Sequence, residues 1–386
     1  MPVVLFAAML SHFTTAERLY STWMSDTFLY KDITPTYGYT ESVLYRAIDK
    51  SFRATKNPIY LEWLQSQIDE VVSPSGDIRG YPRGSIQSLD DYLFGTNILN
   101  IYARTKSPRY TTAVHTLRRN LDAHPRTPDG GFWHRAPTYP DQMWLDGIFM
   151  VDVFYAQYTA TFEPHNNTAW DDITLQFRLV EQHTRNASTG LLYHGFDASG
   201  RAVWADEETG ASPYVWSRAV GWYMMALADC LDYWPKQHVG RRALLGYFRE
   251  LAEGVVKAQD EESGNWYLLL DPELEGREGN YIESSGTAMF VYGLLKGVRM
   301  GYLGKEYSKS AAKGYEMMVE KFVRKNRRGG LDWEGTVRVG SLSGNASYEV
   351  CVATLPFSST FRAQTLLTVN CSTIPLSQLY RMISRA

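Results

Sequence analysis

The stretch "TPDGGFWHR", residues 127–135, holds the pattern that decides the fold: a glycine turn followed at once by apolar and aromatic residues. The pattern returns in "SPSGDIRGY" (73–81), "STGLLYHGF" (188–196), "ESGNWYLLL" (262–270) and "RRGGLDWEG" (327–335). Successive turn glycines are 54, 60, 74 and 65 residues apart, which leaves room for two helices and a loop each time. Such a recurrence indicates a repeated supersecondary unit.

The segments between these turns have helical periodicity. In 96–121 apolar residues recur at helical spacing, and Pro108 divides the run into two helices. The segment 217–234 repeats the pattern, and 284–303 is apolar around most of its circumference, as expected of a buried helix. Strand-like alternation is sparse, apart from pieces such as "GTVRVGSL" (335–342). We therefore predict an all-α domain of paired helices closed into a ring, with loops at one end that supply a cleft.

Composition narrows the class of function. The 386 residues include 39 basic and 42 acidic side chains, so a net charge of −3 provides no basic field for nucleic acid. Aromatic residues make up 14%, with 11 Trp and 26 Tyr, and such rings suit either a sugar-binding cleft or a helical core. Three scattered cysteines, Cys230, Cys351 and Cys371, are too few for a disulfide framework or a metal cage.

The first 16 residues, "MPVVLFAAMLSHFTTA", contain a short apolar run without the basic leader of a signal peptide. No stretch approaches the roughly 18 apolar residues that suggest a membrane span. Four N-x-[ST] sequons would matter only in a secreted protein; they are at Asn166, Asn186, Asn345 and Asn370. We expect a cytoplasmic protein, with secretion as the alternative.

The chain has no glycine-rich phosphate loop, zinc motif, G-x-S-x-G elbow or Cys–His nucleophile arrangement. Carboxylates, His, Arg and Trp near the repeated turns remain, in four stretches. The first, "SIQSLDDYLFGTNIL" (85–99), has Asp90 and Asp91 ahead of a helix. Either acid is an ordinary helix cap, which this stretch alone favours, or a second carboxylate in a cleft.

The second stretch, "GGFWHRAPTYPDQMWLDGIFM" (130–150), gathers stacking, cationic and acidic groups within 14 residues: Trp133, His134, Arg135, Trp144 and Asp146. Asp146 lies among large apolar residues, and burial of an unpaired carboxylate is costly. One interpretation is a helix cap with both Trp side chains in the core. The density of such groups beside a turn favours the other interpretation, a functional acid.

The third stretch, "STGLLYHGFDASGRAVWADEETG" (188–210), contains His194, for which structural and functional roles are equally supported. The fourth, "SPYVWSRAVGWYMMAL" (212–227), places Arg218 and Trp222 on one helical face, with Trp216 just ahead. A guanidinium at the start of an apolar helix needs an anionic partner. That partner is either an internal acid, such as Asp197 or Asp206, or a substrate carboxylate gripped by two hydrogen bonds.

Together these stretches resemble glycoside hydrolase family 105, the unsaturated rhamnogalacturonyl hydrolases. The resemblance runs from about Tyr37 to Glu349 and is carried by "HPRTPDGGFWHR", "YPDQMWLDGIFM", "GLLYHGFD", "SPYVWSRAVGWYMMAL" and "GNYIESSGTAMFVYGLLKG". It implies an (α/α)6 barrel. It also implies a hydrolase that removes an unsaturated uronic acid from the non-reducing end of pectin-derived oligosaccharides, without a metal or cofactor.

The resemblance also implies roles for single residues. Asp146 corresponds to the general acid/base and Asp90 to its partner carboxylate. Arg135 stands where the family has Lys in a His–Lys pair, which keeps the charge but changes the hydrogen-bond geometry. The residues predicted to bind substrate are Tyr39, Trp133, His134, Arg135, Trp144, His194, Trp216, Arg218 and Trp222.

In the implied reaction, Asp146 protonates C4 of the C4=C5 vinyl ether and then takes a proton from the water that attacks C5. A free Asp is ionised at neutral pH, with a pKa of about 3.9. Burial against Trp and Leu and repulsion from Asp90 would both raise the pKa of Asp146. We therefore expect Asp146 to titrate well above a free Asp.

After Glu349 the chain reads "VCVATLPFSSTFRAQTLLTVNCSTIPLSQLYRMISRA" and departs from the family pattern. A shifted reading frame or retained intron would produce such an end. We predict an N-terminal extension over 1–30, a glycosidase domain over 31–349 and an atypical tail over 350–386, with the last hairpin incomplete.

The expected partner is a small oligosaccharide that carries a carboxylate, and neither nucleic acid nor a membrane is expected. Two other functions stay open. One is an unsaturated glucuronyl hydrolase of the related family 88, which acts on glycosaminoglycan fragments. The other is an inactive helical toroid that binds carbohydrate.

Overall fold

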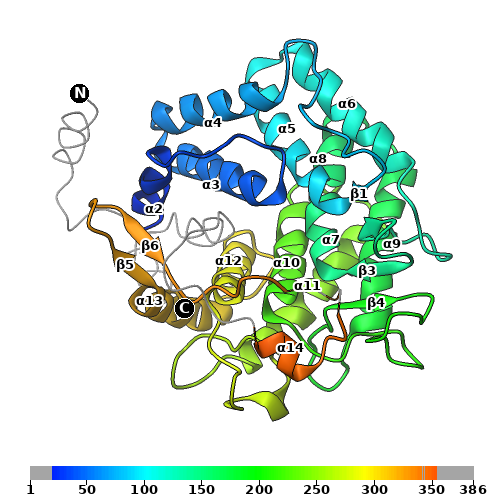
Figure 1. Cartoon of the computed structure of the whole chain (residues 1–386), viewed down its shortest axis with the longest axis vertical. Coiled ribbons are helices and arrows are strands. Elements are labelled where there is room, and N and C mark those ends of the chain that lie inside the picture. Colours follow the sequence, from blue (N-terminus) through cyan, green and yellow to red (C-terminus); the bar gives the residue numbers. More distant parts are fainter. Residues whose placement is uncertain (1–19, 341, 343, 354–386) are drawn as a thin grey trace.

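The computed structural model describes residues 20–340, 342 and 344–353, in which helical hairpins follow one another around a ring (Figure 1). Each hairpin pairs an inner with an outer helix. The inner helices are α3 (Tyr39–Thr55), α5 (Leu93–Thr105), α8 (Val153–Phe162), α10 (Ser217–Cys230) and α12 (Ser284–Arg299). The outer helices are α4 (Pro58–Val71), α6 (Pro108–Asp122), α9 (Asn167–Thr184), α11 (Val239–Lys257) and α13 (Tyr307–Phe322). The predicted all-α fold is confirmed.

The five glycine turns of the sequence follow the five outer helices. Their glycines all have positive φ, between 65° and 92°, a backbone conformation that residues with a Cβ seldom adopt; they are Gly76, Gly130, Gly190, Gly264 and Gly329. Each turn reverses the chain after an outer helix and leads toward the next element of the ring. The repeat in the sequence is therefore a repeat of structure.

The inner helices form the core. All residues of α10 are buried, and α12 is buried along nearly its whole length, as its apolar circumference predicts. Glycines allow these two helices to approach closely. A Cβ on Gly221 would lie 2.7 Å from the Met289 side chain, and one on Gly293 would lie 2.6 Å from Met224.

Short antiparallel strands connect the loops ahead of the inner helices. β1 (Gln87–Ser88) pairs with β2 (Arg135–Ala136), and β3 (Gln142–Trp144) pairs with β4 (Gly195–Asp197). β5 (Val323–Lys325) and β6 (Leu331–Trp333) form a hairpin after α13. Three short helical segments also lie in loops: η1 (Leu89–Tyr92), η3 (Pro272–Leu274) and α14 (Tyr348–Val352).

The helix after β3 has an irregular start. α7 (Leu145–Gly147) passes into a π-helical turn, η2 (Ile148–Asp152), before α8 continues. Asp152 is fully buried, and burial raises the pKa of its carboxyl well above the ordinary value. Wide turns of this kind are frequent at functional sites, and this one comes directly after Asp146.

The N-terminal end of the described chain lies near β6. α2 (Tyr20–Leu29) packs beside α3 and β6, where Thr27 Oγ1 accepts a hydrogen bond from Leu331 N at 3.0 Å. Residues 1–19 and 354–386 lie outside the described part of the chain, and with them the apolar start, Asn370 and Cys371. The predicted domain boundaries and the incomplete last hairpin therefore stay predictions.

Candidate active site

A pocket of about 160 Å³ opens where the inner helices begin. Tyr39 is the first residue of α3, Asp146 the second of α7 and Arg218 the second of α10, so three helix starts meet there. Nine of the eleven predicted site residues line it: Tyr39, Asp90, His134, Arg135, Trp144, Asp146, Trp216, Arg218 and Trp222. The lining also includes Tyr139, Met150, Val339 and Gly340.

Strand pairing brings Asp90 to Arg135. Ser88 lies opposite Arg135 in the β1–β2 pair, two residues before Asp90. The Arg135 guanidinium donates to Asp90 Oδ2 at 2.7 Å and to Ser88 Oγ at 3.2 Å. Asp90 is thus a carboxylate held in place by a charge partner, and Ser88 rather than Asp90 or Asp91 occupies the cap position of η1. Asp91 instead pairs with Arg83 at 3.1 Å.

The other strand pair brings Asp146 to His194. Trp144 lies opposite Gly195, and Leu145 N donates to His194 O at 2.9 Å. This register places His194 Nε2 2.9 Å from Asp146 Oδ2. A Cβ on Gly195 would lie 2.6 Å from the Met143 carbonyl oxygen, so the close strand approach requires glycine.

The predicted rise in the pKa of Asp146 is wrong for the unliganded protein. Burial does raise the pKa, but the charge and hydrogen bond of His194 lower it below its ordinary value. The Asp146 side chain is 19% exposed and that of His194 only 4%. Asp146 is therefore a carboxylate hydrogen-bonded to a buried histidine, with its open side toward the pocket.

Aromatic rings form one wall of the pocket. His134 stacks on Trp144 with ring centroids 4.2 Å apart, and Tyr139 lies 4.7 Å from Trp144 on a tilted plane. Trp216 stacks at 6.2 Å on His194, which lies behind Asp146 and not in the lining. Burial lowers the pKa of His134, so its ring is neutral at physiological pH. The wall therefore combines flat apolar faces with few charges.

Arg218 is held by groups that follow it in the chain. Its Nε donates to Ser285 Oγ at 2.8 Å, its Nη2 to the Val337 carbonyl, and Glu283 lies 3.8 Å away. The suggested internal partners are engaged elsewhere, because Asp197 and Asp206 each accept hydrogen bonds from their own loops.

The loop 335–340 closes the pocket beside Trp216. A Cβ on Gly340 would lie 2.5 Å from the Trp216 ring, so only glycine fits against it. Trp222 is almost wholly buried and stacks on Phe149 at 4.9 Å, which leaves its edge to the pocket. In the structure residues 335–340 form an irregular loop rather than a strand.

Trp133 lies outside the pocket lining. Its indole nitrogen donates to Asp141 Oδ1 at 3.1 Å, while the neighbouring His134 faces the pocket. Tyr139 was not singled out from the sequence, although it opens the "YPDQMWLDGIFM" stretch. Val339 and Gly340 could not be identified as pocket residues from the sequence, since they contribute shape rather than charge.

The described residues contain neither a metal site nor a membrane-spanning helix. No group of three or more His, Cys, Asp or Glu in this part of the chain is arranged to hold a metal ion. None of its helices combines the length and hydropathy needed to span a membrane.

The chain matches the model of Glycosyl Hydrolase Family 88 over residues 15–353. A family 105 glycoside hydrolase from C. acetobutylicum ATCC 824 has a similar structure, with a TM-score of 0.84, 34% identity, and coverage of 92% of this chain and 99% of that chain. The unsaturated rhamnogalacturonyl hydrolase YesR of Bacillus subtilis is 24% identical over 289 residues, 74% of this chain and 76% of YesR. An unsaturated 3S-rhamnoglycuronyl hydrolase of Formosa agariphila is 23% identical over 305 residues, 75% of this chain and 74% of its own length.

These similarities confirm the (α/α)6 toroid that the sequence predicted. The match to the family model covers most of the chain, and the similarity to the C. acetobutylicum enzyme extends over nearly its full length. The chain belongs to glycoside hydrolase family 105, which is related to family 88.

Proposed function

We propose that the chain hydrolyses unsaturated rhamnogalacturonan oligosaccharides and releases the 4,5-unsaturated uronic acid from their non-reducing end. The observation that carries this proposal is the Asp146–His194 pair, which opens onto a pocket that also contains Asp90 and Arg218. Two of the three relatives compared above are, by name, hydrolases of unsaturated substrates, which supports the same chemistry here.

The pocket suits a single uronate ring at its base. Trp144 and Trp216 offer aromatic faces on which the apolar side of a sugar ring stacks. Arg218 supplies positive charge for the substrate carboxylate, and Asp90, fixed by Arg135, accepts hydrogen bonds from ring hydroxyls. With these contacts the C4=C5 bond would lie against Asp146.

The low pKa of Asp146 changes how the acid must work. In the unliganded protein Asp146 is a carboxylate that accepts a hydrogen bond from His194 Nε2 at 2.9 Å. A bound substrate excludes water and adds its own negative charge, and both effects raise the pKa of Asp146. Asp146 is then protonated with the substrate in place, and His194 holds its carboxyl group in position.

Asp146 then protonates C4, and the positive charge that develops at C5 is stabilised by the ring oxygen. The ionised Asp146 takes a proton from the water that attacks C5, which gives a hemiketal. This hemiketal opens and the remaining oligosaccharide leaves. One water is consumed, and Asp146 regains its proton.

The test is the ultraviolet absorbance of the conjugated double bond, which disappears on hydration. We expect loss of absorbance with an unsaturated disaccharide from rhamnogalacturonan lyase digestion. Faster turnover of an unsaturated glycosaminoglycan disaccharide would transfer the assignment to glucuronyl hydrolysis. Unchanged absorbance with both substrates, despite binding, would leave the carbohydrate-binding toroid as the function.

A further inference from the structure

A second cavity, of about 330 Å³, lies at the opposite ends of the inner helices. Arg53 lines this cavity and Tyr39 lines the active-site pocket, on the same helix α3. The 14 residues between them correspond to about 21 Å of helix at 1.5 Å per residue. The two cavities are therefore separate sites, and the substrate chemistry described above does not use the second.

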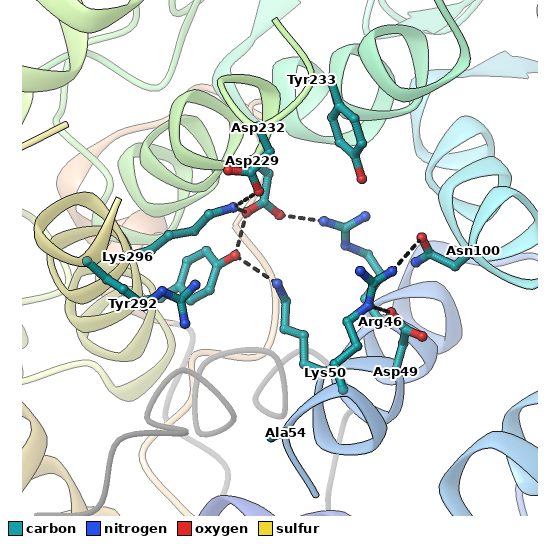
Figure 2. A pocket seen from close by; sticks show the side chains of 12 residues that line it. Arg46, Asp49, Lys50, Ala54, Asn100, Asp229, Asp232, Tyr233, Tyr292 and Lys296 are labelled. Carbon is teal, nitrogen blue, oxygen red and sulfur yellow. Dashed lines mark hydrogen bonds and ion pairs between the residues drawn. The ribbon is translucent and has the colours of Figure 1, made fainter. Parts of the chain in front are cut away.

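The acids of this second cavity are all engaged with cations or hydroxyls (Figure 2). Asp229 accepts hydrogen bonds from Arg46 and Tyr292, and from Lys296 at 2.7 Å. Burial raises the pKa of Asp229, but Lys296, Lys50 and Arg46 lower it far below its ordinary value.

The two remaining acids are engaged in the same way. Lys296 also donates to Asp232, and Asp49 pairs with Arg53 at 2.6 Å and with Arg104. Because these carboxylates already have cationic partners, the cavity is a poor site for a metal ion.

Among the described residues of the cavity, basic side chains outnumber acidic ones. The cavity is lined by three acids and by five basic residues: Arg46, Lys50, Arg53, Lys296 and Arg299. A sixth basic residue, Arg104, pairs with Asp49 from beside the cavity. The carboxyl ends of inner helices contribute about half a negative charge each, so the four helices that meet here offset roughly two of the three excess charges. A positive remainder persists within low-dielectric walls, which concentrate an electric field.

The cavity also has donors that protein groups do not use. The Nε of the buried Arg46 has no hydrogen-bond partner among the described residues. Arg299 lines the cavity and makes no ion pair with any residue in the described part of the chain. Arg299 is exposed to water, but the unsatisfied donor of the buried Arg46 is costly, and buried donors usually have a partner.

We propose that this cavity binds an oxyanion, with Arg46 Nε and Arg299 among its ligands. The chemistry is shared by inorganic phosphate and by the paired carboxylates of an oligogalacturonate. Such an anion would connect α3, α10 and α12 at the end of the ring remote from catalysis. It would stabilise the folded protein without entering the active site.

The test uses the full chain and inorganic phosphate, followed by calorimetric titration and thermal unfolding, with chloride at equal ionic strength as reference. We expect one phosphate per chain and a higher melting temperature in phosphate. Arg299→Gln and Arg46→Lys should each weaken binding about tenfold or more, because each removes a hydrogen bond to the anion, while Lys keeps the positive charge beside Asp229. Arg242→Gln, an exposed arginine on the outer helix α11, is the matched control and should leave affinity within about twofold.

Trigalacturonate, added as a competitor, identifies the source of the anion. Displacement of phosphate assigns the cavity to carboxylated oligosaccharides, and no displacement assigns it to inorganic oxyanions. The proposal is overturned if phosphate gives no more heat or stabilisation than chloride. It is equally overturned if binding persists in both variants, since the anion would then lie elsewhere.

Discussion

The pair of His194 and Asp146 leads to a specific prediction about pH dependence. The change is His194→Gln, which keeps a hydrogen-bonding side chain but removes the imidazole beside Asp146. The bond is 2.9 Å long and the His194 side chain is only 4% exposed, so water replaces it poorly. A charge-assisted bond of this kind contributes about 1.5–3 kcal/mol, or roughly one to two pKa units.

The sign follows from the pKa of Asp146. Asp146 must be protonated to act as the acid, so the loss of its proton sets the alkaline limb of kcat/KM. Burial raises the pKa of Asp146 in the wild type, but His194 lowers it through its charge and its hydrogen bond. In the variant this lowering contribution is gone, so the alkaline limb should move to higher pH by about one to two units.

The assay is the initial rate of absorbance loss on the unsaturated disaccharide across a pH series. His183→Gln is the matched control, because His183 stacks on Phe196 at 4.2 Å and does not line the pocket. An alkaline limb that stays in place or moves to lower pH in the His194 variant would refute the claim that His194 lowers the pKa of the catalytic acid.

Three further changes test other parts of the structure. Asp146→Asn should abolish turnover while the melting temperature and sugar affinity stay close to wild type; measurable turnover in the variant would remove Asp146 from the chemistry. Gly340→Ala forces a Cβ to within 2.5 Å of the Trp216 ring, and overpacking of about 1–3 kcal/mol should appear as a raised KM in the absorbance assay; an unchanged KM would show that the loop can yield. Burial raises the pKa of Asp271 to about 6, so wild-type stability should fall as pH rises from about 4 to 6. Asp271→Asn keeps an acceptor for Val215 N and should be more stable by up to about 3 kcal/mol above pH 6 but equal near pH 4, as measured by urea unfolding; an equal gain at both pH values would argue against the titration.

The fold could be predicted from the sequence because its signal is local. Glycine at a positive φ is required at each of five turns, and the spacing between those turns sets the length of each hairpin. The burial of α12 on nearly all sides is likewise predicted by the apolar residues of that one segment. Nothing in this inference needed a contact between distant parts of the chain.

Most of the residues that line the pocket were named from the sequence, but the pairs that they form were not. Because Trp144 and Leu145 are next to Asp146, the sequence suggested that Asp146 is buried among apolar side chains and that its pKa is raised. The decisive neighbour, His194, comes from 48 positions further along the chain, through a strand register that the sequence does not display. Arg218 likewise has Glu283 nearby and donates to the Val337 carbonyl, which no inspection of its own helix could supply.

The loop 335–340 has a consequence for chain integrity. Its Val337 carbonyl accepts a hydrogen bond from Arg218, and its Gly340 packs against Trp216, although Trp216 and Arg218 lie at the start of α10, about 120 residues earlier. The ring of hairpins can thus be present while one wall of the pocket is missing. Turnover therefore serves as an assay for correct placement of the chain up to Gly340, whereas the helical content of the protein does not.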